Sequence, residues 1–297
     1  MPVNLQMGIF YALVSGTLWG IGPLFLKRGL TLANVSTATL TQQYVAVITL
    51  IVIAVSRGEV FHLVDIPTKA LWAFVAAGAV GASFGKIFYY KGIDKIGASK
   101  STSVKNISPI LTTALAMILL GEELTLPIAV GVALIVAGIL VLTWTQAKGE
   151  KRSNRVSYFF YPLMAAMCFA INPIFKKIGV SESSFPILGA LITQCTGLIM
   201  MLTAGRFLKI KPKWERVPTK SLLYFTLGGI TEALGSLFTY YALTYAPAVL
   251  VSPIWRVSPL VTFILARFTL RGIEVVTLRD GVAAIFIVAG VFVLSLG

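Results

Sequence analysis

The chain of 297 residues has few charged residues: they make up 12% of the sequence, whereas 57% of it is hydrophobic. Soluble globular domains are about 25% charged, and the mean hydropathy of this chain is +0.88. This composition excludes an ordinary soluble domain and indicates an all-α integral membrane protein, in which each spanning segment satisfies its own backbone.

Residue types that build metal and catalytic sites are also scarce. The chain has one histidine, His62, and two cysteines, Cys168 and Cys195, which lie in apolar segments where we expect small buried hydrophobes. A single histidine excludes a histidine relay or a multi-histidine metal site. Acidic residues number only 11 and are scattered. We therefore expect no enzymatic activity, no cofactor and no bound metal.

Ten segments are apolar enough to cross a membrane, which takes roughly 20 helical residues. They cover about residues 8–26, 38–56, 70–90, 98–119, 126–144, 157–175, 185–205, 221–243, 248–266 and 280–296. The first lacks a basic leader and a small-residue cleavage site, so we interpret it as a helix and not as a signal peptide. We predict ten transmembrane helices.

The first five segments are repeated by the last five. YALVSGTLWGIGPLFLKRG (Tyr11–Gly29) aligns with YPLMAAMCFAINPIFKKIG (Tyr161–Gly179), and further matches follow in order at offsets of 150–152. These matches are Leu40-Thr41-Gln42 with Ile192-Thr193-Gln194, Tyr89-Tyr90 with Tyr240-Tyr241, Ser108-Pro109 with Ser258-Pro259, and Ile135–Gly138 with Ile287–Gly290. Because five is odd, the second copy starts from the opposite side of the membrane and the repeats are inverted. We divide the chain into a first repeat (1–145), a linker (146–156) and a second repeat (157–297).

Basic residues gather at helix ends, so the net charge of +14 does not indicate nucleic-acid binding. Loops after odd-numbered segments hold 18 Lys and Arg residues and the other face holds 4, among which we count Lys176 and Lys177. The positive-inside rule then places both termini outside the cytoplasm, in a multi-pass protein of the cell membrane.

The stretch SPILTTALAMILLGEELTLPIAVGVALIVAGILVL (Ser108–Leu142) resembles the end of an EamA-type repeat of the drug/metabolite transporter superfamily. The shared features are a mid-helix proline, the pair Gly121-Glu122 at a hairpin, and a glycine-containing last helix. The second copy departs from this pattern, with Arg271 intruding and Glu274 displaced. The resemblance implies a ten-helix transporter fold. It leaves the substrate open, since the superfamily moves amino acids, nucleotide sugars, sugar phosphates, drugs and choline, and its members usually keep their termini cytosolic.

Four residues are candidates for a charge at membrane depth: Lys86, Lys105, Glu232 and Arg256. A charge at membrane depth costs about 2.5–3.5 kcal/mol, so each should face a cavity or a partner. At 1.5 Å per residue, Lys105 lies roughly 10 Å from one membrane face and Arg256 roughly 13 Å from the other. Asn106 aligns with Arg256, and Lys105 with Trp255, so we expect both segments at one central cavity.

Three cations against one acid favour an anionic or zwitterionic substrate, held by Lys105 and Arg256. Alternatively, Lys86 reaches the helix end and Arg256 pairs with Glu232. Glu232 itself is either a permanent counter-ion of Arg256 or Lys86, or a carboxylate that couples transport to protons.

A narrower resemblance is to sugar-phosphate/phosphate translocators of this superfamily, which hold phosphate with a Lys on helix four and a Lys-Arg pair on helix nine. Lys105 and Arg256 match two of these residues, but Trp255 stands in place of the second Lys. This change removes a charge and adds a stacking surface, which leaves carboxylates, including aromatic and amino acids, as candidates.

Other polar and aromatic residues are candidates for the cavity wall: Trp19, Gln42, Asn172, Gln194, Tyr90, Tyr241, Asn106, Lys86 and Trp255. Asn172 and Gln194 can instead bond to another helix. The pairs Tyr89-Tyr90 and Tyr240-Tyr241 lie near helix ends, where an interfacial aromatic belt is the alternative. Gly131, Gly138, Gly281 and Gly290 are expected to form helix-packing faces.

These observations predict a secondary transporter that moves a small anionic or zwitterionic metabolite by alternating access, with exchange of two anions as one form. Two alternatives remain open: a proton-coupled exporter of amino acids or drugs that uses Glu232, and a membrane enzyme acting on a lipid-linked substrate. The expected partners are the small-molecule substrate and the lipid bilayer, with no nucleic acid, for a monomer or a homodimer.

Overall fold

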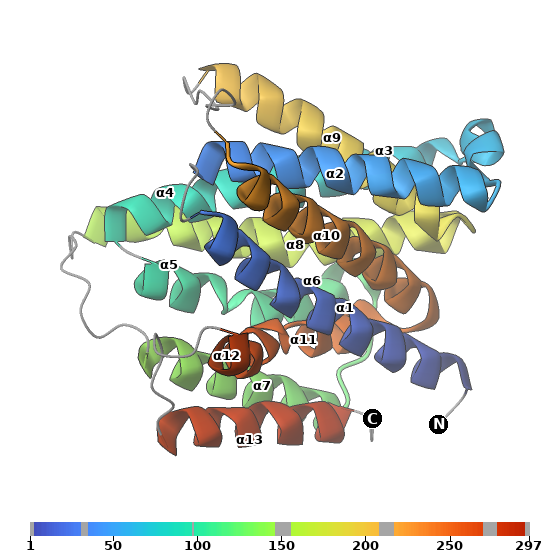
Figure 1. Cartoon of the computed structure of the whole chain (residues 1–297). Helices are drawn as coiled ribbons and strands as arrows, with labels where there is room; N and C mark the ends of the chain where they lie inside the picture. Colours follow the sequence, from blue (N-terminus) through green and yellow to red (C-terminus); the bar gives the residue numbers. More distant parts are fainter. Residues whose placement is uncertain are drawn as a thin grey trace.

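The computed structural model describes residues 3–30, 35–96, 98–145, 156–207, 217–269 and 278–294. These parts are helical throughout apart from short connections, and the helices run along one bundle (Figure 1). The first half contains α1 (Val3–Gly29), α2 (Val35–Ser56), η1 (Glu59–Asp65), α3 (Thr68–Ala77), η2 (Gly78–Gly85), α4 (Lys86–Ile96), α5 (Ala98–Lys105), α6 (Ser108–Leu120) and α7 (Leu126–Thr145). The second half contains η3 (Val156–Phe159), α8 (Phe160–Glu182), α9 (Pro186–Phe207), α10 (Thr219–Tyr245), α11 (Ala248–Trp255), α12 (Ser258–Thr269) and α13 (Leu278–Leu294).

Within the described chain, six helical stretches are long and apolar enough to span a membrane: Asn4–Gly29, Thr37–Ser56, Thr68–Ile93, Ser157–Glu182, Pro186–Thr203 and Thr219–Tyr245. Four shorter apolar stretches complete the set: Ser108–Leu120, Leu126–Val141, Ala248–Thr262 and Gly281–Leu294. They correspond in order to the ten predicted spans and confirm an all-α membrane fold.

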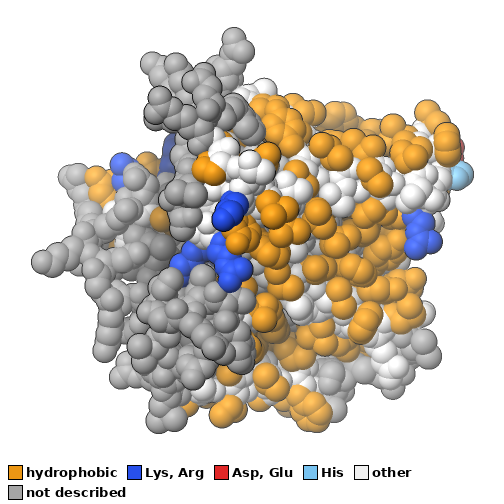
Figure 2. Space-filling view, viewed as in Figure 1, with side chains coloured by type: hydrophobic (Ala, Val, Ile, Leu, Met, Phe, Trp, Pro, Cys, Tyr) orange, Lys and Arg blue, Asp and Glu red, His pale blue; other side chains and the backbone are white. Residues whose placement is uncertain are grey.

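The two ends of the helix bundle are formed by different parts of the chain. The end at the right of Figure 1, here called the terminal end, has the start of α1, the turn η1 and the short connections 121–125, 183–185 and 246–247. The opposite end, here called the linker end, is where α1, α4, α7, α9 and α12 finish. Apolar side chains cover much of the surface between the two ends (Figure 2).

The halves pack across each other and not side by side. Helix α1 lies along α10, and its counterpart α8 lies along α3. Gly29 packs against the ring of Phe225, and the equivalent Gly179 packs against the ring of Phe74, so closely that a Cβ on either glycine would overlap the ring. The same contact thus forms twice with the repeats exchanged, as expected for inverted repeats.

The fourth and ninth spans are broken, although the sequence predicts each as one continuous helix. Helix α5 ends at Lys105 before α6 begins at Ser108, and α11 ends at Trp255 before α12 begins at Ser258. Each break directly precedes the repeated Ser-Pro pair. Proline has no N–H to donate, so Pro109 and Pro259 cannot bond to the carbonyls four residues earlier, at Lys105 and Trp255, where α5 and α11 end. In the first turn of the following helix, where these prolines lie, the missing N–H costs nothing.

The fifth and tenth spans, α7 and α13, form a close helix pair. Gly131, Gly138 and Gly290 face the neighbouring backbone so closely that a side chain would collide with it. These three positions confirm the predicted packing faces. The prediction for Gly281 is wrong, because no atom of the described residues lies within 4 Å of a Cβ at that position.

Candidate functional site

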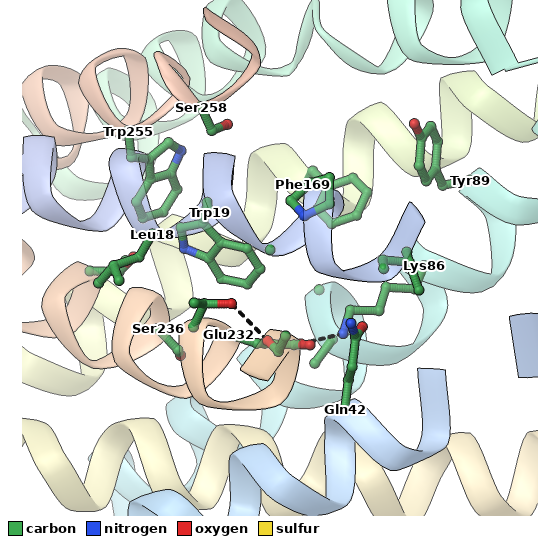
Figure 3. A pocket seen from close by; sticks show the side chains of 18 of the residues that line it. Leu18, Trp19, Gln42, Lys86, Tyr89, Phe169, Glu232, Ser236, Trp255 and Ser258 are labelled. Atoms are coloured by element: carbon green, nitrogen blue, oxygen red, sulfur yellow. Dashed lines mark hydrogen bonds and ion pairs between the residues drawn. The ribbon is translucent and has the colours of Figure 1, made fainter. Parts of the chain in front are cut away.

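A cavity of about 660 Å³ lies in the middle of the bundle and extends toward the linker end. Its wall combines the linker-end half of α1 with parts of α2, η2, α4, α5, α8, α9, α10, α11 and α12. The cavity is therefore built from both repeats and includes the two breaks. Figure 3 shows Trp19 and Trp255 in one part of it, with Phe169, Tyr89 and Lys86 in another.

Most of the site residues predicted from the sequence line this cavity. They are Trp19, Gln42, Lys86, Lys105, Asn172, Gln194, Glu232, Trp255 and Arg256. Asn106 is buried and follows Lys105 in the chain, but it is not among the lining residues. The side chain of Tyr90 lies outside the described residues, so its predicted role is not addressed by the structure.

Glu232 forms an ion pair with Lys86 in the wall of the cavity (Figure 3). The Nζ of Lys86 donates to Oε1 of Glu232 at 2.5 Å and to Oε1 of Gln43 at 3.2 Å. Gln43 donates in turn to the side chain of Gln194 at 2.8 Å. The alternative in which Lys86 reaches the helix end and Arg256 takes Glu232 is therefore wrong for this conformation.

Lys86 directly follows a π-helical stretch, η2, in which the helical turns of the third span are wider over Gly78–Gly85. Asn172 of α8 donates from Nδ2 to the carbonyl of Ala77 at 2.7 Å, at the point where the π-helix begins. The Asn172 side chain packs directly on Gly81. Asn172 thus lines the cavity and also ties two helices together, as its alternative interpretation proposed. A π-helical segment inside an α-helix is frequent at functional sites.

Lys105 ends the half-helix α5 and lies among aromatic rings. Its Nζ is 4.6 Å from the ring centroid of Tyr89 and 5.7 Å from that of Phe169. The Tyr89 hydroxyl forms a 2.7 Å hydrogen bond with Thr102, so Tyr89 belongs to the cavity wall and not to an interfacial belt. The belt interpretation is also wrong for Tyr240, which is fully buried and hydrogen-bonded to Thr193.

Arg256 caps the half-helix α11, at the second break. Its backbone N–H donates to the carbonyl of Pro253 at 3.1 Å, and its guanidinium carbon lies 5.9 Å from the ring centroid of Phe169. Lys105 and Arg256 thus approach the same ring from the two repeats. The Nε of Arg256 is buried and has no hydrogen-bond partner among the described residues.

Polar atoms without partners concentrate at the two breaks. Among the described side chains, the buried N and O atoms that lack a hydrogen bond belong to Ser83, Asn106, Ser108, Ser252 and Arg256. All but Ser83 lie within four residues of a break. Buried polar groups are normally hydrogen-bonded, so this concentration marks a place where a polar ligand or water can bind.

Lys176 is a site residue that the sequence analysis missed, because we placed it in the loop after the sixth span. Helix α8 continues to Glu182, and Lys176 is only 6% exposed. Its Nζ lies 5.2 Å from the ring centroid of Tyr240 and 5.6 Å from that of Trp255. The helical spacing of Phe169, Asn172 and Lys176, three and then four residues apart, places them on one face and was the available signal.

The charges of the cavity wall are unbalanced. Lys86 is paired with Glu232, and no described carboxylate lies within ion-pair distance of Lys105, Lys176 or Arg256. Each of these three cations lies over an aromatic ring instead. An exposed fifth cation, Lys27, lines the cavity nearer the linker end.

At the terminal end, charged side chains form hydrogen bonds with the backbone of neighbouring helix ends. Glu122 accepts hydrogen bonds from the backbone N–H groups of Ala248 (2.7 Å) and Val249 (2.8 Å), and so caps the start of α11. Lys177 donates to the carbonyls of Leu243 (2.7 Å) and Ala246 (3.1 Å) at the end of α10. A carboxylate at a helix start and a cation at a helix end are both favoured by the helix dipole.

Aromatic packing adds to this closure between α1 and α10. The ring of Tyr11 lies 5.5 Å from Tyr241 and 5.8 Å from both Phe238 and Tyr245, centroid to centroid. None of these four residues lines the cavity. The predicted substrate-binding position of Tyr241 is therefore not in the cavity of this conformation; Tyr241 packs at the closed terminal end.

Comparison with known sequences identifies the architecture. The sequence pattern of the EamA-like transporter family matches residues 6–144 and again residues 156–296. The chain belongs to this family. The two matches, one in each half of the chain, agree with the two repeats, and the family indicates a membrane transporter of small molecules.

Individual relatives match over about one repeat length. An uncharacterized transporter of Sinorhizobium sp. is 26% identical over 133 residues, which cover 45% of this chain and 94% of the relative. An uncharacterized protein of Methanocaldococcus jannaschii is 27% identical over 137 residues, covering 45% of this chain and 93% of the relative. A crystal structure with 16% sequence identity superposes with a TM-score of 0.80 over 98% of this chain and 97% of the other, which shows the same fold.

Proposed function

We propose that this EamA-family protein is a secondary transporter that carries a small anionic or zwitterionic metabolite by alternating access. The observation that carries the proposal is the set of three cavity cations, Lys105, Lys176 and Arg256, that have no described carboxylate partner. Each costs about 2.5–3.5 kcal/mol at membrane depth when it is unpaired. A bound anion offsets this cost by supplying the missing negative charge.

The same electrostatics favour exchange over one-way transport. Closing an empty cavity takes mutually repelling cations further out of water, whereas closing it around an anion buries a neutralised cluster. We infer that the loaded carrier changes conformation more readily than the empty one. Outward movement of one anion is then tied to inward movement of another.

Alternating access is supported by the difference between the two ends of the bundle. The cavity extends toward the linker end, while capping bonds and aromatic packing join the helices at the terminal end. Inverted repeats can exchange conformations to produce the opposite arrangement. If the positive-inside rule holds for this chain, the linker end faces the cytoplasm and this conformation is open inward.

We assign Glu232 as the counter-ion of Lys86, because the Nζ of Lys86 and the Oε1 of Glu232 lie 2.5 Å apart in the cavity wall. The alternative of a proton-coupled exporter requires Glu232 to bind and release a proton during each cycle. Replacing Glu232 with Gln distinguishes the two. Under our assignment Glu232→Gln weakens folding and transport alike, whereas a coupling role predicts intact exchange that no longer responds to a proton gradient.

The proposed substrate class is tested by thermal unfolding of the purified protein in detergent, since a ligand that binds only the folded state raises its melting temperature. Sugar phosphates, carboxylates, amino acids and quaternary amines form the panel. We expect stabilisation by one or more anions, lost in Lys105→Ala and Arg256→Ala and kept in the surface variant Lys69→Ala. Stabilisation by amines alone would contradict the proposal.

A further inference from the structure

We infer that the site selects organic anions with two negative charges, and that Lys176 is the residue that sets this preference. The inference rests on the proposed function and narrows its substrate class. It combines the charge balance of the cavity with the positions of its aromatic rings.

The charge balance shows how much negative charge the cavity lacks. The ion pair with Glu232 satisfies Lys86. Lys105, Lys176 and Arg256 remain, and no described carboxylate lies within ion-pair distance of them. A monoanion would neutralise one of these three charges and leave two, whereas a dianion leaves one. A zwitterion brings a cation of its own and is the least suited of the three classes.

The aromatic rings divide these cations into two groups. Lys105 and Arg256 each lie within 6 Å of the ring centroid of Phe169, while Lys176 lies over Trp255 and Tyr240. A ring face attracts a cation weakly compared with a charged oxygen. The three cations therefore divide into a pair at Phe169 and a single lysine at Trp255, which offers two places for two anionic groups of one ligand.

The cavity also has room for a carbon skeleton that joins the two anionic groups. Its volume of about 660 Å³ is within the range of sites for small organic ligands. Leu18, Trp19 and Trp255 give it an apolar side (Figure 3). A dicarboxylate or a phosphate monoester with an organic body fits this combination of charge and surface.

Lys176 supplies a positive charge that the equivalent position of the first repeat lacks. The aligned residue in the first repeat is Leu26, so this charge is not required by the repeated fold. The Lys176 side chain is only 6% exposed, yet it has no carboxylate partner among the described residues. Its removal should change the preferred ligand charge without removing the pair formed by Lys105 and Arg256.

The test compares ligands that share a skeleton and differ by one charge: phthalate with benzoate, and succinate with butyrate. Binding to the purified full-length protein is measured by isothermal titration and by thermal shift. For the wild type we expect each dianion to bind at least about 10-fold tighter than its monoanion, as one added charge-assisted contact predicts. The aromatic and aliphatic pairs distinguish the contribution of ring stacking from that of charge.

In Lys176→Met we expect the dianion to lose about 10-fold or more in affinity while the monoanion changes less than about threefold. Lys176→Arg, which keeps the charge, should retain the preference, as should the surface control Lys69→Met. A wild type that binds dianion and monoanion equally overturns the inference and leaves the proposed function standing. Equal losses for both ligands in Lys176→Met also overturn it, and binding of no anion at all overturns the proposed function itself.

Discussion

The two repeats share the residues that pack their helices, whereas the buried charges of the cavity do not repeat. Gly29 and Gly179 make the same contact with Phe225 and Phe74, and both broken spans stop before a Ser-Pro pair. Lys105 aligns with Trp255 and Lys176 with Leu26, although the exposed Lys27 is repeated by Lys177. The symmetric residues shape a scaffold with two equivalent conformations, and the asymmetric ones build a single site within it.

The largest effect on stability is expected from breaking the ion pair between Lys86 and Glu232. Lys86→Met removes the ion-pair partner of Glu232 in the cavity wall, which should cost about 3–5 kcal/mol of stability. The double variant Lys86→Met with Glu232→Met should recover most of this loss, since no charge is then left alone. Thermal unfolding followed by tryptophan fluorescence measures both. A double variant less stable than the single one would show that the pair is not the cause.

A matched comparison is possible for the equivalent glycine–phenylalanine contacts of the two repeats. Gly29→Ala and Gly179→Ala each force a methyl group into a phenylalanine ring, which should cost about 1–3 kcal/mol in either repeat. Gly281→Ala, where space is open, serves as the control and should be neutral or slightly stabilising. Clearly unequal losses for Gly29 and Gly179 would contradict the equivalence of the two contacts.

The two breaks should differ in binding. Arg256→Ala removes a cation that lines the cavity, so the affinity for phthalate should fall about 10-fold or more. Asn106→Ala changes the aligned residue of the first repeat, which does not line the cavity, and should lower affinity by less than about threefold. Isothermal titration provides both values. Similar losses at the two positions would mean that the breaks contribute equally to the site.

A smaller effect is expected from the closure at the terminal end. Glu122→Ala removes the cap of α11 and should cost about 1 kcal/mol, in favour of conformations in which this end is open. A cysteine introduced at the buried Ser15, with Cys168 and Cys195 replaced by Ala, should then react faster with a water-soluble thiol reagent. An unchanged reaction rate would show that Glu122 does not hold the terminal end closed.

The sequence predicted the parts of the molecule that depend on periodicity and repetition. The long apolar segments and matches such as Gly29 with Gly179 could be recognised from hydropathy and repetition. Lys105 and Arg256 could be singled out because a charge at membrane depth is energetically costly. For Glu232 the sequence left two counter-ions open, Arg256 and Lys86, and the structure pairs it with Lys86, which directly follows a π-helical segment. Lys176 was missed because the sixth span was predicted to end at residue 175, whereas α8 continues to Glu182 and places Lys176 inside the helix.

The breaks in the fourth and ninth spans were also not predicted from the sequence. The prolines of the Ser-Pro pairs were visible, yet both spans were expected to be continuous, since proline in a membrane helix can also give a kink. The structure stops each helix just before the pair. Which outcome occurs depends on neighbouring helices, and on whether they or a ligand can satisfy the exposed backbone and side-chain groups.

The most direct test of the central claim is counterflow of labelled phthalate into proteoliposomes. The wild-type protein is reconstituted into liposomes that are either empty or preloaded with unlabelled phthalate, beside an Arg256→Ala preparation. An anion exchanger predicts rapid uptake into preloaded liposomes, slow uptake into empty ones, and loss of the difference in Arg256→Ala. Equal uptake into empty and preloaded liposomes, or preloading-dependent uptake that Arg256→Ala leaves intact, would contradict a cationic cavity that exchanges organic anions.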